Sequence, residues 1–463
     1  MRRLCSIALV AACLAGSLAA APSVGVAAPT QATGTAGQAN ASALVRARSP
    51  RTVSTSAANA RIRRMLPTRI RSQSKLLGPR FTMTVWDTAS SRYAYRRRAK
   101  ASLRGASTTK ILTAVGVLQT MGPERRLPTR VVAGGTKREV VLTAGGDPLL
   151  TSADLRALAR GTAVALGRVK PSPTPSATSS SQTPAASSST SAARARIIVR
   201  ADDSLFPGPG QSLGWPNSYM PRQVRPVSAF ARDDNKARDA TADAGAYFAA
   251  SLRALGVPAR YAGETTAERG ARVLATFAGH SVAEAVSHTL LVSDNDTAEM
   301  LFRQVAVGRG LPGTWAGART ALARALAELE IPLQGVRIVD GSGLSLRGRL
   351  TAGALTSALV RALSPKYPRL AGLRGWLPLA GRTGTLKAKF LRFDTAPAKC
   401  AAGRIQAKTG TVADAIGLAG YAVGADGRTK VFVALVNSRP KRYSRVQTRR
   451  AVDRVASGIT GCW

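Results

Sequence analysis

The chain has 463 residues, of which 45% are hydrophobic, so it is long enough to form two or three domains with apolar cores. Its 67 lysines and arginines against 24 acidic residues give a formal net charge of +43, which favours polyanionic partners. Nucleic acid is not expected among them, because only 5% of the residues are aromatic and no nucleic-acid-binding motif occurs. The charge fits anionic wall polymers or a membrane surface, or else a solvated arginine-rich surface without a specific partner.

Residues 1–28 have the pattern of a secretory signal peptide. Arg2 and Arg3 precede an uncharged stretch rich in Ala and Leu over 4–21, and small residues follow at 26–28. An uncleaved anchor is an alternative, although the stretch is slightly shorter than the roughly 20 residues of a membrane span. A lipoprotein signal ending at Cys13 is another. Each of the three places the folded part outside the cytoplasm, so we expect a secreted, cell-wall-associated protein.

Residues 29–75 are mostly Ala, Ser, Thr, Gln and Gly with scattered arginines, a composition typical of a flexible basic linker. The part from 61 to 71 is also compatible with a short basic helix. The alternation over 81–87 predicts a strand, and 92–95 is expected to return beside it as a hairpin partner.

A Ser-x-x-Lys motif follows at Ser107 and Lys110. The apolar spacing over 111–121 predicts a helix with one buried face, so Ser107 stands at a helix N-terminus and Lys110 lies one turn further on. Side chains so placed suit a nucleophile and its base, and free N–H groups at a helix start can stabilise an oxyanion. The other matches, at 72–75 and 438–441, have a proline within or just after them and open no such helix.

The middle of the chain predicts further strands at 129–132 and 139–142, with a turn at 145–148. From 171 to 193 only Ser, Thr, Pro, Ala and Gln occur, so we expect a disordered stretch. Helices are expected at 247–255 and 282–292.

Two further motifs occur once each. Ser293-Asp294-Asn295 follows the helix expected at 282–292, and Lys408-Thr409-Gly410-Thr411 lies among the strands expected from 404 to 437. Gly381 to Thr385, with Arg382 as its cation, is an alternative third motif, but its flanks do not predict strands.

Together the three motifs predict one acyl-transfer site. Taken singly, each is more typical of a helix cap or a solvated strand residue, but their combination in this order marks β-lactamases and penicillin-binding proteins. Ser107 would attack a carbonyl carbon, Lys110 would accept its proton and Ser293 would relay that proton to the leaving nitrogen. Asn295 would orient the peptide. A carboxylate clamp and an oxyanion donor would come from the third motif, which comprises Lys408, Thr409, Gly410 and Thr411.

The few histidines and cysteines of the chain argue against several other kinds of catalytic or metal site. His280 and His288 are the only histidines, so neither a Ser-His-Asp triad nor a multi-histidine metal site is expected, and no cofactor or metal is implied. After removal of the signal, Cys400 and Cys462 remain as an even pair. In an exported protein they are expected to form a disulfide, the alternative being two free buried thiols.

Over residues 76–463 the chain resembles the class C low-molecular-mass penicillin-binding proteins, the D-alanyl-D-alanine carboxypeptidase/endopeptidase family. The resemblance rests on the three motifs and on further segments, namely Gly145-Gly146-Asp147-Pro148, Asp203-Ser204-Leu205-Phe206, Gly214-Trp215, Pro226-Val227-Ser228-Ala229 and Asp340-Gly341-Ser342-Gly343-Leu344-Ser345. It implies an α+β, β-lactamase-like transpeptidase domain, whose antiparallel sheet is flanked by helices, plus a smaller inserted domain. It also implies an acyl-enzyme mechanism on peptidoglycan stem peptides that end in D-Ala-D-Ala, with β-lactams as covalent inhibitors.

The expected domains follow from this resemblance. Residues 76–145 and 285–463 would form the catalytic domain, and 146–284 the inserted domain, with 171–195 as its disordered stretch. In one respect the chain departs from the family: members that favour a free diaminopimelate amine carry an acidic residue shortly after the tryptophan matching Trp215, and residues 216–219 contain none.

Two other functions compete with a carboxypeptidase that also has possible endopeptidase activity. A class A β-lactamase would need a Glu-x-x-x-Asn loop, but no asparagine occurs between Asn295 and Asn437. A non-catalytic wall-binding or β-lactam-sensing protein would rely on charge instead of the serine, and the intact motifs argue against it.

Overall fold

The computed structural model describes residues 53–171 and 195–463. The expected signal peptide, the first part of the linker and almost all of the Ser/Thr/Pro-rich stretch lie outside the described residues. Within those two ranges, every helix is too short or too polar to cross a lipid bilayer.

The first sheet is antiparallel throughout and joins the two ends of the described chain. Its strand order is β2-β1-β10-β9-β8. The strands are β1 (Arg80–Asp87), β2 (Arg92–Arg97), β8 (Ile405–Thr411), β9 (Ile416–Val423) and β10 (Thr429–Asn437). Strands β1 and β10 pair along their whole lengths, from Arg80 with Asn437 to Asp87 with Lys430. Strand β8 is left at one edge, and this edge carries the third motif.

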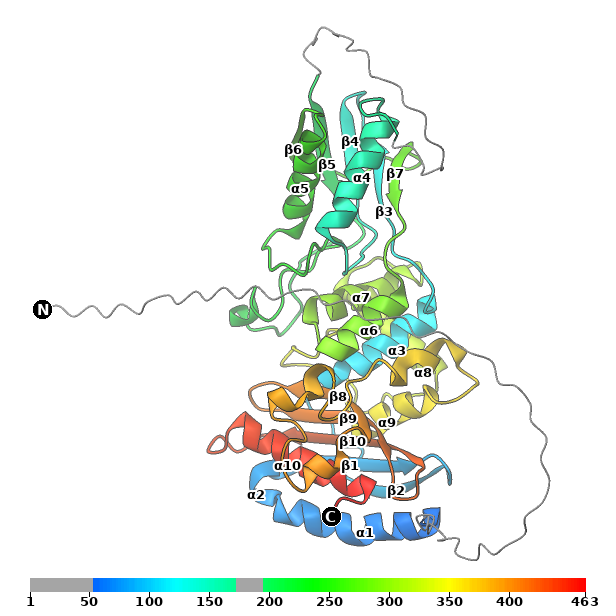
Figure 1. Ribbon diagram of the computed structural model, residues 1–463, viewed down its shortest axis with the longest axis vertical. Coiled ribbons are helices and arrows are strands. Elements are labelled where there is room, and N and C mark those ends of the chain that lie inside the picture. Colours follow the sequence, from blue (N-terminus) through cyan, green and yellow to red (C-terminus); the bar gives the residue numbers. More distant parts are fainter. Residues whose placement is uncertain (1–52, 172–194) are drawn as a thin grey trace, which may run out of the picture. The chain divides into compact units, whose positions relative to one another are not determined.

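Helices cover both faces of this sheet, which explains why β9 and β10 are apolar at nearly every position. One face packs against α1 (Thr55–Ser72), α2 (Ser74–Leu77) and α10 (Arg445–Ser457), as Figure 1 shows. The other packs against a group of helices comprising α3 (Lys110–Met121), α6 (Val282–Val292), α7 (Asn295–Val307), α8 (Trp315–Glu328) and α9 (Ala352–Arg361). The α+β, β-lactamase-like fold expected for this part is confirmed.

Helix α1 corrects the expectation of a flexible linker over residues 29–75. Its last part, from Thr55, is an 18-residue helix that packs into the core. Ile62, Leu66 and Ile70 recur every four residues and are all buried, so they form an apolar stripe within an otherwise basic segment. The average composition of residues 29–75 does not reveal this stripe. The alternative prediction of a short basic helix over 61–71 was correct for part of α1.

The second sheet is mixed and has the order β6-β5-β4-β3-β7. Its strands are β3 (Thr129–Ala133), β4 (Glu139–Thr143), β5 (Ile197–Asp202), β6 (Ala259–Glu264) and β7 (Val273–Phe277), and the helices α4 (Ser152–Ala165) and α5 (Ala240–Ala254) pack with it. Strand β4 pairs in parallel with β5, whereas β3 pairs antiparallel with both β4 and β7.

This topology moves the expected domain boundaries. Strands β3 and β4, assigned above to the catalytic domain, belong to the second sheet, so the insertion begins before Thr129 and not at residue 146. The pairing of β4 with β5 spans the Ser/Thr/Pro-rich stretch, and no local pattern signals so distant a partner. Conversely, Phe206, Trp215 and Val227 lie in the expected insertion but pack into the core beside α3.

Short 3-10 helices connect the longer elements. They are η1 (Ala106–Thr109), η2 (Asn217–Tyr219), η3 (Pro368–Arg374), η4 (Gly384–Leu386), η5 (Ala388–Phe390), η6 (Ala398–Ala401) and η7 (Gly458–Thr460). Cys400 in η6 and Cys462 after η7 form a disulfide, as expected. It fastens the C-terminus to the segment that precedes β8.

Candidate active site

Ser107 lies on the single 3-10 turn η1, and Lys110 is the first residue of α3. The Lys110 side chain is fully buried, and its Nζ donates to Ser107 Oγ at 3.0 Å, to Asn295 Oδ1 at 2.7 Å and to the Ser342 carbonyl at 3.2 Å. The first and second motifs therefore meet at one ammonium group, as the sequence predicted.

The second motif joins two helices. Ser293 ends α6 in the left-handed conformation, with φ of 66°, and Asp294 caps α7 by accepting from the Thr297 amide at 2.6 Å. This sharp turn directs Ser293 Oγ to within 2.7 Å of Lys408 Nζ. Asn295 Nδ2 donates to the carbonyl of Gln223 at 2.7 Å, so a loop from the expected insertion is attached to the site.

Strand β8 presents the third motif beside Ser107. Lys408 is fully buried and Thr411 is exposed, while Thr409 Oγ1 lies 2.8 Å from Thr385 Oγ1. A Cβ atom at Gly410 would lie 2.9 Å from the Gly105 carbonyl oxygen and 3.3 Å from the Ser107 nitrogen. Only glycine lets β8 pass so close to the turn that holds Ser107.

The motifs open onto one pocket of about 300 Å³. Ser107, Ser293, Asn295, Thr409 and Thr411 line it with Leu344 and Thr385, which stand in segments already noted in the sequence. Four further lining residues were not anticipated from the sequence, namely Gln223, Phe390, Arg392 and Arg449. Thr385 belongs to the alternative third motif, so that segment lies beside Lys408 instead of replacing it. Residues 216–219 do not line the pocket, and Trp215 is buried with its indole donating to Asp340.

The two lysines both have lowered pKa values. Burial lowers the pKa of Lys110, while the negative charges of Glu299, Asp294 and Asp340 oppose that shift. Burial also lowers the pKa of Lys408 well below its usual value, and the positive charge of Lys110 adds to this effect. Burial is therefore the principal cause of both shifts.

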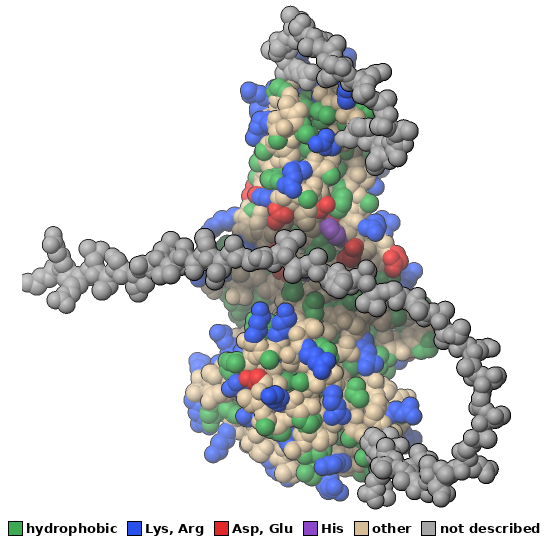
Figure 2. Space-filling model, viewed as in Figure 1, with side chains coloured by type: hydrophobic (Ala, Val, Ile, Leu, Met, Phe, Trp, Pro, Cys, Tyr) green, Lys and Arg blue, Asp and Glu red, His purple; other side chains and the backbone are tan. Residues whose placement is uncertain are grey.

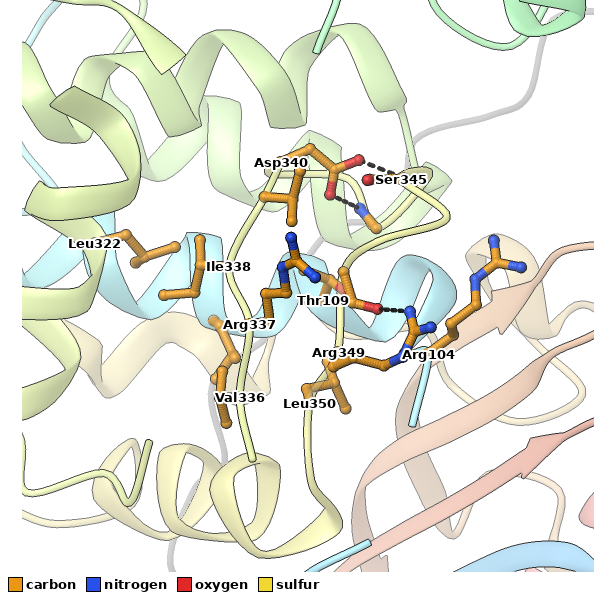
Figure 3. A pocket seen from close by; sticks show the side chains of 15 residues that line it. Arg104, Thr109, Leu322, Val336, Arg337, Ile338, Asp340, Ser345, Arg349 and Leu350 are labelled. Carbon is orange, nitrogen blue, oxygen red and sulfur yellow. Dashed lines mark hydrogen bonds between the residues drawn. The ribbon is translucent and has the colours of Figure 1, made fainter. Parts of the chain in front are cut away.

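A buried carboxyl group holds the 340–345 loop in place, and this loop provides the Ser342 carbonyl that accepts from Lys110. Glu299 accepts from the amides of Gly341 at 2.7 Å and Ser342 at 2.8 Å, and burial together with the charge of Asp340 raises its pKa. Asp340 accepts from the amides of Gly343 and Ser345, as Figure 3 shows. These contacts aim the Ser342 carbonyl at Lys110. The adjoining cavity of about 20 Å³ in Figure 3 has room for one water molecule.

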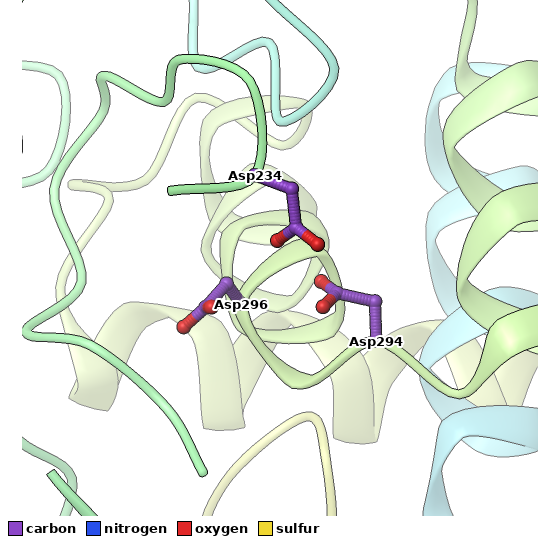
Figure 4. A group of neighbouring side chains, drawn as sticks. All are labelled: Asp234, Asp294 and Asp296. Carbon is purple, nitrogen blue, oxygen red and sulfur yellow. The ribbon is translucent and has the colours of Figure 1, made fainter. Parts of the chain in front are cut away.

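Asp234, Asp294 and Asp296 form a group whose carboxylate oxygens lie within 4.8 Å of one another (Figure 4). Lys236 pairs with both Asp296 and Asp234, so a cation already balances part of their charge. Asp296 also accepts from the Arg225 amide at 2.8 Å. The group therefore attaches the 225–236 loop to the start of α7 and supports Asn295.

Comparison with known families identifies the chain. The family model described as "D-Ala-D-Ala carboxypeptidase 3 (S13) family" matches residues 66–170 and 220–458. The chain belongs to this family. Its prediction as a low-molecular-mass penicillin-binding protein of the serine carboxypeptidase type is thereby confirmed.

Curated relatives share most of their length with the chain. A carboxypeptidase of Mycobacterium tuberculosis is 30% identical over 392 residues, which cover 82% of this chain and 79% of the relative. Carboxypeptidase DacB of Mycolicibacterium smegmatis is 29% identical, with 82% of this chain and 80% of the relative covered.

Solved structures share the fold. Penicillin-binding protein 4 of Haemophilus influenzae superposes with a TM-score of 0.67 at 19% identity, covering 84% of this chain and 98% of that protein. A predatory peptidoglycan endopeptidase of Bdellovibrio bacteriovorus gives a TM-score of 0.52 at 13% identity, covering 82% and 92%.

Proposed function

We propose that this protein removes the terminal D-alanine from peptidoglycan stem peptides ending in D-Ala-D-Ala, through an acyl-enzyme on Ser107. The observation that carries this proposal is the 3.0 Å contact between Lys110 Nζ and Ser107 Oγ in a pocket that also holds Ser293 and the Lys408 strand. A buried amine with a lowered pKa can accept a proton from a serine hydroxyl.

In acylation, Ser107 Oγ bonds to the carbonyl carbon of the penultimate D-alanine while Lys110 takes its proton. The backbone amide groups of Ser107 and Thr411 would donate to the oxyanion. Ser293 Oγ, 2.7 Å from Lys408 Nζ, relays this proton from Lys110 to the amide nitrogen as the C–N bond breaks, so D-alanine leaves and Lys110 is neutral again. Water then attacks the ester while Lys110 accepts a proton from it, and that proton returns to Ser107 Oγ as the ester C–O bond breaks.

The remaining motif residues orient the substrate. Lys408 and the hydroxyl groups of Thr409 and Thr411 present a positive, hydrogen-bonding surface to the terminal carboxylate of the leaving D-alanine. Hydrogen bonds to Lys110 and to the Gln223 carbonyl fix the Asn295 amide at the edge of the pocket, where it would contact the peptide. β-Lactams, which carry a carboxylate next to a reactive amide, would acylate the same serine.

Such a substrate places the enzyme outside the cytoplasm. The signal-like pattern of residues 1–28 and the Cys400–Cys462 disulfide both support an exported protein that works in the cell wall.

Intact mass after incubation with benzylpenicillin tests the proposal. We expect one covalent adduct on the wild type and none on Ser107→Ala, and only the wild type should release D-alanine from a stem pentapeptide. Absence of the adduct on folded wild-type protein would favour the non-catalytic binding function. Steady hydrolysis of nitrocefin would instead favour a β-lactamase.

A further inference from the structure

A second pocket, which we call the basic groove, adjoins the active-site pocket. It has a volume of about 740 Å³ and lies at the end of β8, the 439–444 turn and the start of α10. Five of its nine lining residues are basic and none is acidic, the basic ones being Arg439, Lys441, Arg442, Arg445 and Arg449. Thr411 and Arg449 line both pockets, so the groove continues from the catalytic site.

Most of these cations have no anionic partner within the described residues. Arg439 donates to backbone carbonyls, including that of Ala413 at 3.3 Å. Lys441, Arg442 and Arg445 are exposed, and neither they nor Arg449 form a salt bridge to any described carboxylate. The wider surface is also rich in basic side chains, as Figure 2 shows on one face, but in the groove five of them converge beside a reactive serine.

Arg449 is the most informative of the five. Its Nε atom is buried without a hydrogen-bond partner. Asp453, one turn further along α10, already binds Arg392 through both carboxylate oxygens, at 2.8 Å and 2.5 Å. The half-buried Arg449 therefore lines the pocket with its charge only partly compensated, and a bound anion that accepts from its guanidinium would offset the cost of the unsatisfied Nε.

We propose that the basic groove is a leaving-group subsite that binds an additional carboxylate on the leaving strand of a cross-link, so that the enzyme prefers leaving strands with free carboxylates to those whose carboxylates are amidated. This inference rests on the proposed function, in which Thr411 faces the carboxylate of the leaving residue. Thr411 lines both the active-site pocket and the groove, so a leaving strand that extends past Thr411 would enter the groove. The chemistry is unchanged: Ser107 forms the ester, the amide C–N bond breaks, and the leaving amine receives the proton.

The carboxylate preference of the leaving strand tests this subsite. The experiment measures kcat/KM for two synthetic cross-linked stem-peptide dimers. In one dimer the carboxylates of the leaving strand are free, and in the other they are amidated. For the wild type we expect kcat/KM to be about tenfold higher for the free carboxylates, the size of one charge-assisted hydrogen bond. In Arg442→Gln/Arg445→Gln that ratio should fall towards one, and Arg449→Gln should lower it independently.

The matched control removes two positive charges from the opposite edge of the sheet. Arg92→Gln/Arg97→Gln on β2 should keep the wild-type ratio, which separates a local subsite from a general effect of net charge. A wild-type ratio near one would overturn the subsite. So would a groove variant that keeps the wild-type ratio but loses binding to phosphate-containing wall polymers. Failure of the proposed function can be told apart from failure of the subsite, because only in the former case would the wild type form no benzylpenicillin adduct.

Discussion

The two sheets of the molecule are surrounded by different kinds of buried polar group. In the strands and helices of the second sheet, the buried polar side chains among the described residues are all hydroxyls, those of Thr129, Thr162, Thr241 and Ser251. Around the first sheet, lysines and carboxyl groups are buried as well, including Lys110, Glu299, Asp340 and Lys408.

The difference reflects what each kind of group requires. A hydroxyl is satisfied locally, as when Thr162 Oγ1 donates to the Leu158 carbonyl at 2.8 Å within one helix. A buried charge needs partners from several elements, since losing them costs several kcal/mol. Lys110 finds them on η1, α7 and the 340–345 loop. The candidate active site thus lies beside the first sheet, and the second sheet has the polar content of an ordinary structural core.

Lys110→Met should have the largest effect on activity, because it removes the proposed base and leaves only an apolar side chain in its place. We expect acylation by benzylpenicillin to slow by about 10³-fold, the size of a general-base contribution, while the protein remains folded. The matching change in the second sheet, Leu158→Ala, should lower the free energy of unfolding by about 2–5 kcal/mol and leave the acylation rate of the folded protein unchanged. Stopped-flow acylation and thermal unfolding measure both, and equal acylation rates for Lys110→Met and the wild type would contradict the assignment.

Gly410→Ala should have the next largest effect, because its Cβ would meet the backbone of Gly105 and displace either β8 or the Ser107 turn. A shift of this kind should reduce the acylation rate by about 10²-fold with a small change in melting temperature. Gly353→Ala on α9, where a Cβ would make an ordinary 3.5 Å contact, is the control and should acylate normally. If both variants acylate at the wild-type rate, the close approach of β8 has no catalytic importance.

The smallest effect is expected at the junction between the sheets, where the His280 ring lies 2.9 Å from an oxygen of Asp147. This hydrogen bond raises the pKa of His280 above its usual 6.5. The stabilisation is therefore complete below the unfolded-state pKa and is lost as the pH rises through the higher folded-state pKa. Because the ring is partly exposed, we expect a change below about 1 kcal/mol. Chemical denaturation from pH 5 to pH 9 should show it in the wild type, and His280→Gln should lose this dependence.

The family and the residues proposed for catalysis could both be predicted from the sequence. Ser107, Lys110, Ser293 and Lys408 stand in short motifs whose local structure, a helix start, a turn and a strand, is encoded by their neighbours. Even the pair Cys400 and Cys462 followed from counting, because only two cysteines remain once the expected signal is removed.

Features that depend on contacts between residues far apart in the chain became visible only in the tertiary structure. The parallel pairing of β4 with β5, the burial of the α1 stripe and the convergence of Gln223, Thr385 and Arg449 on the pocket all join residues far apart in the chain. Burial also set the pKa of Lys110, since neighbours in sequence do not reveal how much water a side chain loses on folding. Local sequence patterns predict local geometry, whereas the free energy of a buried charge depends on all the elements that surround it in the folded protein.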